Sequence, residues 1–290
     1  MTDSTSTTSR TFLITGVSSG FGRAFAEAAL AAGHTVVGTV RSQDTLAAFE
    51  TLAPRRAKGV LLDITEFDRV GPIVAEVERE VGPIDVLVNN AGYGHEGTVE
   101  ESPLDELRRQ FDANVFGAVA VIKAVLPGMR QRRSGRIINV TSMGGFITMP
   151  GIAYYCGSKF ALEGISEVLA AEVKGFGIHV TALAPGSFRT DWAGRSMVRS
   201  GRSIADYDAL FDPIRQARLE KSGRQAGDPR RAAQVLLQLV ADENPPVHLL
   251  LGNDAVDLVQ AKLDNLRKEI AKWEAISRST DYAGSHGKKE

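Results

Sequence analysis

The chain contains, near its start, the stretch Thr15-Gly16-Val17-Ser18-Ser19-Gly20-Phe21-Gly22, which indicates the fold. Apolar and β-branched residues precede it at 12–15, and residues 24–32 after it are rich in helix-forming alanine. Glycines between a strand and a helix permit a tight turn and let a pyrophosphate approach the backbone at the positive end of the helix. The context predicts a dinucleotide-binding loop, with a purely structural turn as the alternative.

Short apolar runs alternate along the chain with segments of helical periodicity. Between two such runs, Val70, Val74 and Val77 recur at helical spacing, and Leu162, Ile165 and Leu169 do the same further on. Alternating strands and helices predict an α/β fold: a Rossmann-like, doubly wound parallel sheet with helices on both faces. Seven strands are expected, at residues 12–15, 35–40, 59–62, 84–88, 136–140, 178–183 and 247–251. Without an evident linker or repeat, residues 11–277 are interpreted as one domain.

Two further motifs follow the glycine loop in order. Asn89-Asn90-Ala91-Gly92 follows the fourth expected strand, and Ser142 precedes Tyr155-Cys156-Gly157-Ser158-Lys159. Together with the Gly-xxx-Gly-x-Gly spacing of the loop, these motifs resemble those of the short-chain dehydrogenase/reductase family, over about residues 11–252. The resemblance implies a compact NAD(P)-dependent oxidoreductase that interconverts a carbonyl and an alcohol.

Tyr155 and Lys159 stand four residues apart, so a helix would place both on one face. A phenol with a pKa near 10 is a usable acid, and a nearby ammonium would favour its ionised form. The resemblance implies that Tyr155 exchanges the proton with the carbonyl oxygen and that Lys159 also binds the nicotinamide ribose. It further implies that Ser142 positions and polarises the substrate oxygen, and that Asn114 holds a water that links the lysine to solvent.

The second expected strand ends in Val40-Arg41, where NAD-specific folds carry an acidic residue. Arg41 can instead form charge-assisted bonds to a 2'-phosphate, so NADP(H) is favoured over NAD(H), although a solvated surface charge would look the same. By resemblance Asp63 contacts the adenine, and the segment from Pro185 to Thr190 closes over the nicotinamide. The cofactor-binding residues are expected to be Gly16, Ser18, Ser19, Gly20, Phe21, Gly22, Arg41, Asp63, Ile64, Asn90, Ala91, Gly92, Tyr155, Lys159, Pro185, Gly186, Phe188 and Thr190.

Other residues with chemical potential are given structural interpretations. Tyr154 lacks a lysine four residues on and is expected to pack, and Cys156 is interpreted as a small packing residue. His95 and His179 lack a second ligand at metal spacing, so no metal site is expected. Two functional alternatives stay open: a non-catalytic NADP-binding sensor or scaffold, and an NADP-using epimerase or dehydratase.

The composition of the chain limits the classes of partner that it is expected to bind. The chain has 290 residues, 43% of them hydrophobic, a formal net charge of -1 and one cysteine. This balance gives no electrostatic footprint for nucleic acid or an anionic membrane, and no uninterrupted apolar stretch long enough to span a bilayer is expected. A single cysteine excludes an internal disulfide and fits a reducing compartment, so a cytoplasmic location is expected. The remaining partner class is a small-molecule carbonyl or alcohol.

Two segments depart from the strand and helix alternation. Residues 191–228 are polar and basic and are interpreted as a substrate lid or, equally, a surface helical insertion. Residues 254–277 predict a C-terminal helix whose apolar residues dock on the parent domain or on a neighbouring subunit. Residues 1–10 and 278–290 are expected to be flexible.

The resemblance implies a homodimer or homotetramer, built on the helices that carry Asn114 and Tyr155. A mainly apolar substrate pocket is expected from Met143, Phe146, Tyr93, Phe188, Trp192 and Met197.

Overall fold

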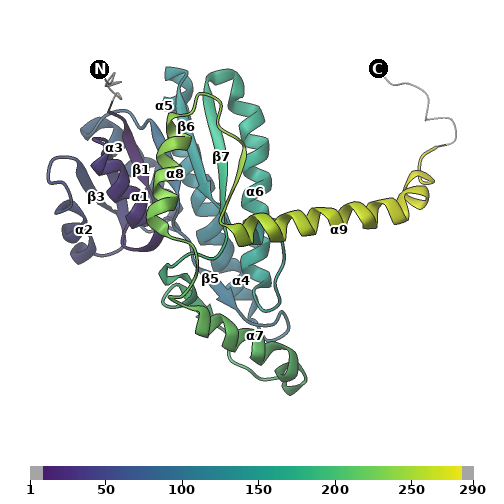
Figure 1. The fold of residues 1–290 in the computed structure, drawn as a ribbon. Coiled ribbons are helices and arrows are strands. Elements are labelled where there is room, and N and C mark those ends of the chain that lie inside the picture. Colours follow the sequence, from purple (N-terminus) through teal and green to yellow (C-terminus); the bar gives the residue numbers. More distant parts are fainter. Residues whose placement is uncertain (1–8, 283–290) are drawn as a thin grey trace, which may run out of the picture.

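The computed structural model describes residues 9–282, which form a seven-stranded parallel sheet covered by helices on both faces (Figure 1). The strands are β1 (Thr11–Ile14), β2 (Thr35–Val40), β3 (Ala57–Leu61), β4 (Val86–Asn89), β6 (Gly135–Val140), β7 (Ile178–Pro185) and β9 (His248–Leu251). Their order across the sheet is β3-β2-β1-β4-β6-β7-β9, and every pairing is parallel. The sequence prediction of a doubly wound parallel sheet is confirmed.

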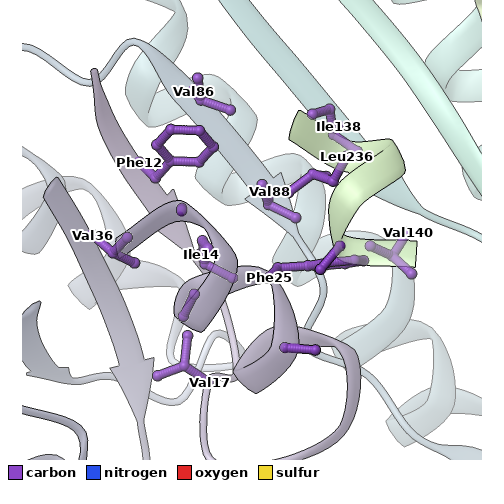
Figure 2. Close-up of a cluster of buried hydrophobic side chains, with 14 of the residues drawn as sticks. Phe12, Ile14, Val17, Phe25, Val36, Val86, Val88, Ile138, Val140 and Leu236 are labelled. Carbon is purple, nitrogen blue, oxygen red and sulfur yellow. The ribbon is translucent and has the colours of Figure 1, made fainter. Parts of the chain in front are cut away.

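Two separate apolar cores lie on the two faces of the sheet. Strand alternation sends Phe12 and Ile14 of β1 to one face, while Leu13 joins the cluster on the other. In the first cluster, Phe25 and Leu236 pack on the strand residues (Figure 2). The helices of this face are α1 (Gly20–Ala31) and α8 (Pro229–Ala241), and those of the other are α3 (Phe67–Glu80), α5 (Gly117–Arg132) and α6 (Ala153–Val173).

The switch in strand order fixes where ligands can bind. The chain runs outward from β1 through β2 to β3, then returns to the other side of β1 with β4. At such a switch point the loops at the carboxyl ends of neighbouring strands diverge and leave a crevice. The loop after β1 contains the glycines, and the loop after β4 begins with Asn90. The remaining helix on this half of the sheet is α2 (Gln43–Glu50), which begins just after Arg41.

One helical stretch corrects an expectation from the sequence. Within the described part of the chain, Leu104–Arg132 is long and apolar enough, by length and composition alone, to span a membrane. It consists of α4 (Leu104–Phe111), the π-helical turn η1 (Asp112–Phe116) and α5, which follow one another without a break. Val121, Val125 and Met129 of α5 are buried in the core beside the sheet. Packing beside the sheet thus accounts for the apolar residues of α5 that face the core.

Residues 191–228 form a small helical addition with a second sheet that the sequence did not predict. Strand β8 (Met197–Arg199) pairs with β5 (Gly94–Glu96), and α7 (Asp208–Lys221) follows. Glu96 is buried and anchors this addition, because Arg199, Arg215 and Arg218 all form salt bridges with its carboxylate. Short turns complete the chain: η2 (Met143–Gly145), η3 (Lys174–Phe176), η4 (Asp191–Ala193) and η5 (Ala205–Tyr207).

The C-terminal helix is α9 (Asn253–Arg278). The sequence predicted that it docks either on the parent domain or on a neighbouring subunit, and most of it does not dock on the parent domain. Only Ala255 and Val259, near its start, are buried, and every residue from 260 to 278 is exposed. Figure 1 shows the helix leaving the body of the protein and pointing away from it. Docking on the parent domain is therefore limited to the first two turns.

The expected flexible ends are only partly described. Residues 1–8 and 283–290 lie outside the described residues. Arg10, placed in the flexible segment by the sequence, is tied to the domain: its backbone N–H donates to Nδ1 of His34 at 3.2 Å, and its guanidinium donates to the Val240 carbonyl. Among the described residues, contacts with the domain are already present at Ser9 and Arg10, immediately before β1.

Candidate active site

A cavity of about 1050 Å³ opens at the carboxyl ends of the parallel strands. Typical small-molecule sites measure about 300 to 1,000 Å³, so this one has room for an extended ligand. Most of the residues that the sequence singled out line it: Gly16, Ser18, Ser19, Gly20, Phe21, Arg41, Asp63, Ile64, Asn90, Ala91, Gly92, Ser142, Tyr155, Lys159, Pro185, Gly186, Phe188 and Thr190. Of the site residues predicted from the sequence, Gly22 and Asn114 are absent from the lining.

The glycine loop and the loop after β4 are tied together by hydrogen bonds. The Thr15 hydroxyl accepts from the backbone N–H groups of Asn90 and Ala91, each at 3.0 Å. The Asn90 side chain donates to the carbonyls of Thr15 and Gly16 at 2.9 and 3.0 Å. Asn90 therefore steadies the crevice. The Thr15 hydroxyl forms two of these four hydrogen bonds, and the sequence analysis did not identify it.

Three glycines of the loop each answer a steric requirement. Gly16 and Gly20 have φ of 72° and 57°, in the left-handed region that favours glycine. A Cβ on Gly22 would stand 2.1 Å from the Gly16 carbonyl oxygen and 2.5 Å from Asn90 Nδ2. Glycine at position 22 thus leaves room for the Gly16 carbonyl and the Asn90 side chain. The result is a backbone cradle at the start of α1, which fits the phosphates of a dinucleotide.

Arg41 lies at the end of β2 beside the cavity, and its side chain is 81% exposed. Its Nη1 is 3.9 Å from Oδ2 of Asp63, a distance that leaves only a weak ion pair in solvent. Asp63 Oδ1 is already engaged by the N–H and the hydroxyl of Thr65, at 3.0 and 2.8 Å. The guanidinium can therefore turn toward a phosphate without breaking a strong contact.

Ser142, Tyr155 and Lys159 meet at the other end of the cavity. Ser142 follows β6 and accepts a hydrogen bond from the N–H of Gly144 at 3.0 Å, while its side chain is also hydrogen-bonded to Tyr155. Lys159 lies one turn after Tyr155 on α6, with Nζ 5.7 Å from the centroid of the tyrosine ring. Nζ donates to the Val140 carbonyl at 2.9 Å. All three side chains are buried and converge on one wall.

Burial controls the protonation of this group. It raises the pKa of Tyr155, while the hydrogen bond with Ser142 acts in the opposite direction. Burial also lowers the pKa of Lys159 to about 8, and the carboxylate of Glu163 opposes this shift. The sequence prediction that the lysine lowers the phenol pKa is not met by the protein alone, because desolvation is the largest effect. Burial therefore favours the protonated phenol of Tyr155.

Asn114 lies behind the catalytic wall within the π-helical turn η1. Its Oδ1 accepts from the Tyr93 N–H at 3.1 Å, and its Nδ2 donates to the Tyr93 carbonyl at 3.1 Å and to Ser158 Oγ at 3.0 Å. A Cβ on Gly92 would be 2.7 Å from Asn114 Oδ1 and 3.9 Å from Lys159 Nζ. Asn114 is thus close to the lysine, and its role in holding water stays a prediction.

None of the residues that were given structural interpretations from the sequence lines the cavity. The Tyr154 hydroxyl donates to the Ser102 carbonyl at 2.8 Å. Cys156 is buried, and burial raises the pKa of its thiol. His95 is hydrogen-bonded to Ser200 Oγ at 2.9 Å and does not line the cavity. Among residues 9–282, no three His, Cys, Asp or Glu side chains gather in a way that could hold a metal ion.

The substrate pocket expected from the sequence is partly corrected. Tyr93, Met143, Phe188 and Trp192 line the cavity, with Met149 and Ile152 in addition. Phe146 and Met197 do not: Phe146 packs edge-on against His248, and Met197 lies in the small sheet against Gly94. The lining is also less apolar than predicted, since it includes the charged residues Glu106, Arg109, Asp112, Arg195, Arg218 and Lys221.

Glu163, which is buried, and His248, which is half-buried, extend the wall formed by Ser142, Tyr155 and Lys159, and the sequence analysis did not identify them. The Glu163 carboxylate accepts from the Thr141 hydroxyl and pairs with His248 Nδ1 at 2.8 Å. Burial raises the pKa of Glu163, and both of these bonds counteract it. The available signal was spacing, because Tyr155, Lys159 and Glu163 follow one another at four-residue intervals on α6.

Asp254, in the first turn of α9, positions the loop that follows β7. Its Oδ2 accepts from the Ser187 N–H at 2.9 Å, and a Cβ on Gly186 would stand 2.2 Å from its Oδ1. Both Asp254 and Leu258 line the cavity. Nothing in the local sequence pattern indicates this, because the contact joins residues far apart in the chain.

Comparison with known proteins agrees with this geometry. Residues 10–198 match the family model described as short chain dehydrogenase. The chain belongs to the short-chain dehydrogenase family. It is 39% identical over 267 residues to oxidoreductase BOA17 of Botryotinia fuckeliana, which covers 92% of this chain and 97% of that protein. It is 38% identical over 242 residues to 3-ketodihydrosphingosine reductase of Bacteroides thetaiotaomicron, covering 83% of this chain and 87% of the relative.

A solved structure supports the same assignment to the short-chain dehydrogenases. A short-chain dehydrogenase from Streptomyces avermitilis is 42% identical, with a TM-score of 0.88, over 94% of this chain and all of that chain. The present protein is thus an NAD(P)-dependent oxidoreductase of this family.

Proposed function

We propose that this short-chain dehydrogenase is an NADP(H)-dependent enzyme that interconverts a lipophilic ketone or aldehyde and its alcohol. The observation that carries the proposal is the convergence of Ser142, Tyr155 and Lys159 on a cavity whose other end is the glycine cradle. A protonated phenol next to a hydroxyl suits a carbonyl oxygen, which needs hydrogen bonds as negative charge develops on it.

In the direction of reduction, the Ser142 hydroxyl holds the substrate oxygen and Tyr155 transfers its proton to that oxygen. The glycine loop, Tyr155 and Lys159 would hold a reduced nicotinamide cofactor, whose chemistry would be to give a hydride to the carbonyl carbon: a C–H bond of the nicotinamide would break, and one C–H and one O–H bond of the alcohol would form as the C=O π bond is lost. The raised pKa of Tyr155 keeps the proton available. Lys159 Nζ has three N–H donors, one of which serves the Val140 carbonyl. The other two are free to face the cofactor ribose and the phenol oxygen.

Support for NADP(H) comes from the end of β2, where Arg41 stands beside the cavity without a strong partner. A guanidinium matches a phosphate in geometry and charge. Support for a lipophilic substrate comes from Met149, Ile152 and Trp192 in the lining and from the 3-ketodihydrosphingosine reductase among the relatives.

Exposed apolar side chains support the homodimer or homotetramer that the sequence predicted on the helices with Asn114 and Tyr155. Phe116 lies next to Asn114 at the end of η1, and Phe160 and Val168 lie on α6; all three are exposed in the single chain. The cytoplasmic location stays a prediction.

The decisive variant is Tyr155→Phe, with Tyr154→Phe as its matched control. Tyr155→Phe should lower kcat by about 10²- to 10⁴-fold, because the proton donor is lost while the ring is kept. Tyr154→Phe should stay within a few-fold of the wild type, since that hydroxyl only contacts the Ser102 carbonyl. Oxidation of NADPH is followed by absorbance with a panel of ketones and aldehydes, and NADPH binding by fluorescence titration. Equal rates for both variants would refute the role of Tyr155.

A further inference from the structure

The exposed part of α9 carries an apolar stripe that continues the buried contact of its first turns. Val256, Val259, Leu263, Leu266, Ile270 and Trp273 follow one another at intervals of three and four residues, which is a heptad pattern. Val259 is buried against the body of the protein, whereas Leu266, Ile270 and Trp273 are 41%, 60% and 54% exposed. The stripe therefore begins as an intramolecular interface and runs on into solvent.

The body of the same chain cannot cover the outer part of the stripe, because the helix points away from it (Figure 1). A second copy of α9 offers a surface of the same length and chemistry. Twofold symmetric pairing of identical surfaces is the commonest route to a homodimer. In an antiparallel pair, Leu263 would face Leu266 of the partner subunit, and Trp273 would face Val256 of the partner subunit.

Charges beside the stripe distinguish the two directions of pairing. In an antiparallel pair Lys262 would flank Glu269 of the partner subunit, and this favourable contact would occur twice by symmetry. In a parallel pair Lys262 would instead meet Arg267 of the partner subunit, and Glu269 would meet Glu274 of the partner subunit, so both contacts would be repulsive. Within residues 9–282 of one chain, neither Lys262 nor Glu269 takes part in a salt bridge. The charges therefore match antiparallel pairing.

We propose that α9 is a dimerisation arm that pairs with α9 of a second copy of this chain in antiparallel orientation. The stripe covers about two and a half heptads, fewer than an independent coiled coil needs, so the pair requires support at its ends. Antiparallel pairing provides it, because the outer end of each helix reaches the base of the other. That base holds Asp254 and Leu258, which line the cavity. The arm would thus join the assembly to the wall of each active site.

The first test is the solution mass of Leu266→Glu, measured by light scattering after size-exclusion chromatography. A carboxylate in the middle of the stripe should halve the mass relative to the wild type at the same chain concentration. Asn265→Glu is the matched control: it adds the same charge one residue away, off the stripe, and should leave the mass unchanged. Helix content by circular dichroism should be equal in all three proteins. A wild-type protein that is already monomeric, or an unchanged mass for Leu266→Glu, overturns the proposal.

A charge exchange tests the orientation without disturbing the apolar contact. Lys262→Glu and Glu269→Lys should each weaken dimerisation at low salt, about threefold or more in dissociation constant. The combined variant, Lys262→Glu with Glu269→Lys, should recover the wild-type value because both pairs are restored with reversed sign. Stronger association of the single Lys262→Glu variant would indicate parallel pairing and overturn the proposal. Sedimentation of the wild type with phosphatidylcholine vesicles, lost in Leu266→Glu at unchanged mass, would assign the stripe to lipid and also overturn it.

Discussion

The two ends of the cavity are built by different means. The end proposed for the cofactor phosphates, after β1 and β4, is shaped by glycines such as Gly16 and Gly20 with their left-handed φ, and by backbone groups that the side chains of Thr15 and Asn90 hold in place. The catalytic end, after β6 and along α6, consists of buried ionisable side chains, above all Tyr155 and Lys159. The geometry of the first end depends on positions where a side chain would not fit. The chemistry of the second end depends on the charge of its side chains. Substitutions should therefore fail in different ways at the two ends.

The largest effect of this kind is expected for Gly22→Ala. The added Cβ would stand 2.1 Å from the Gly16 carbonyl oxygen, and both the loop and the Asn90 contact must shift to make room. Overpacking of this sort costs about 1 to 3 kcal/mol in unfolding free energy. Because the cradle is displaced, NADPH binding should be lost at concentrations that saturate the wild type, as measured by fluorescence titration.

Gly71→Ala is the control for this comparison. Gly71 lies inside α3 and outside the cavity lining, and apart from its chain neighbours no atom lies within 4 Å of its Cβ position, so alanine should keep NADPH binding. Pro72 directly after it opposes any gain in stability, because a Cβ before proline crowds the proline ring. Equal unfolding midpoints in urea and equal NADPH affinity for Gly22→Ala and wild type would show that the loop is not held by steric fit.

A smaller effect is expected for Arg41→Ala, which tests charge at the end otherwise built from backbone. Loss of a charge-assisted contact to a 2'-phosphate should raise the KM for NADPH about 10- to 100-fold and leave the KM for NADH nearly unchanged. Arg55→Ala removes the same charge from an exposed residue that does not line the cavity and should change neither value. A parallel rise of both KM values in Arg41→Ala would argue against recognition of the 2'-phosphate.

The sequence could reveal the features that are encoded by local patterns, at both ends of the cavity, but not those that depend on contacts between distant residues. The glycine spacing and the four-residue step from Tyr155 to Lys159 are local patterns, and the seven strands are marked by apolar runs. The contact of Asp254 with the loop after β7 joins residues 67 positions apart and leaves no local pattern. The three-residue strands of the small sheet are too short to show alternation. Periodicity showed that α9 has an apolar face, but not what covers it.

The smallest effect is expected for Glu163→Gln, which alters charge at the catalytic end without touching the cavity lining. Glu163 raises the pKa of Lys159 against the lowering by burial, which brings it to about 8. The ammonium form is present below that pKa and is lost as the pH rises through it, so activity that needs the cation falls on the basic side. Removal of the carboxylate charge lowers the Lys159 pKa further, and the basic limb of the kcat profile should move to lower pH.

Glu167→Gln is the matched control on the same helix. Glu167 is exposed, and its carboxylate lies 3.8 Å from His248 Nε2, so its loss should leave the pH profile in place. The neutral-pH rate of Glu163→Gln should fall only a few-fold, since Tyr155 and Ser142 are intact, and the shift of the basic limb separates an electrostatic role from a structural one. A basic limb of the kcat profile that stays in place in Glu163→Gln, together with reduced thermal stability, would mean that Glu163 contributes to packing alone. The charge at the catalytic end would then be set without this carboxylate.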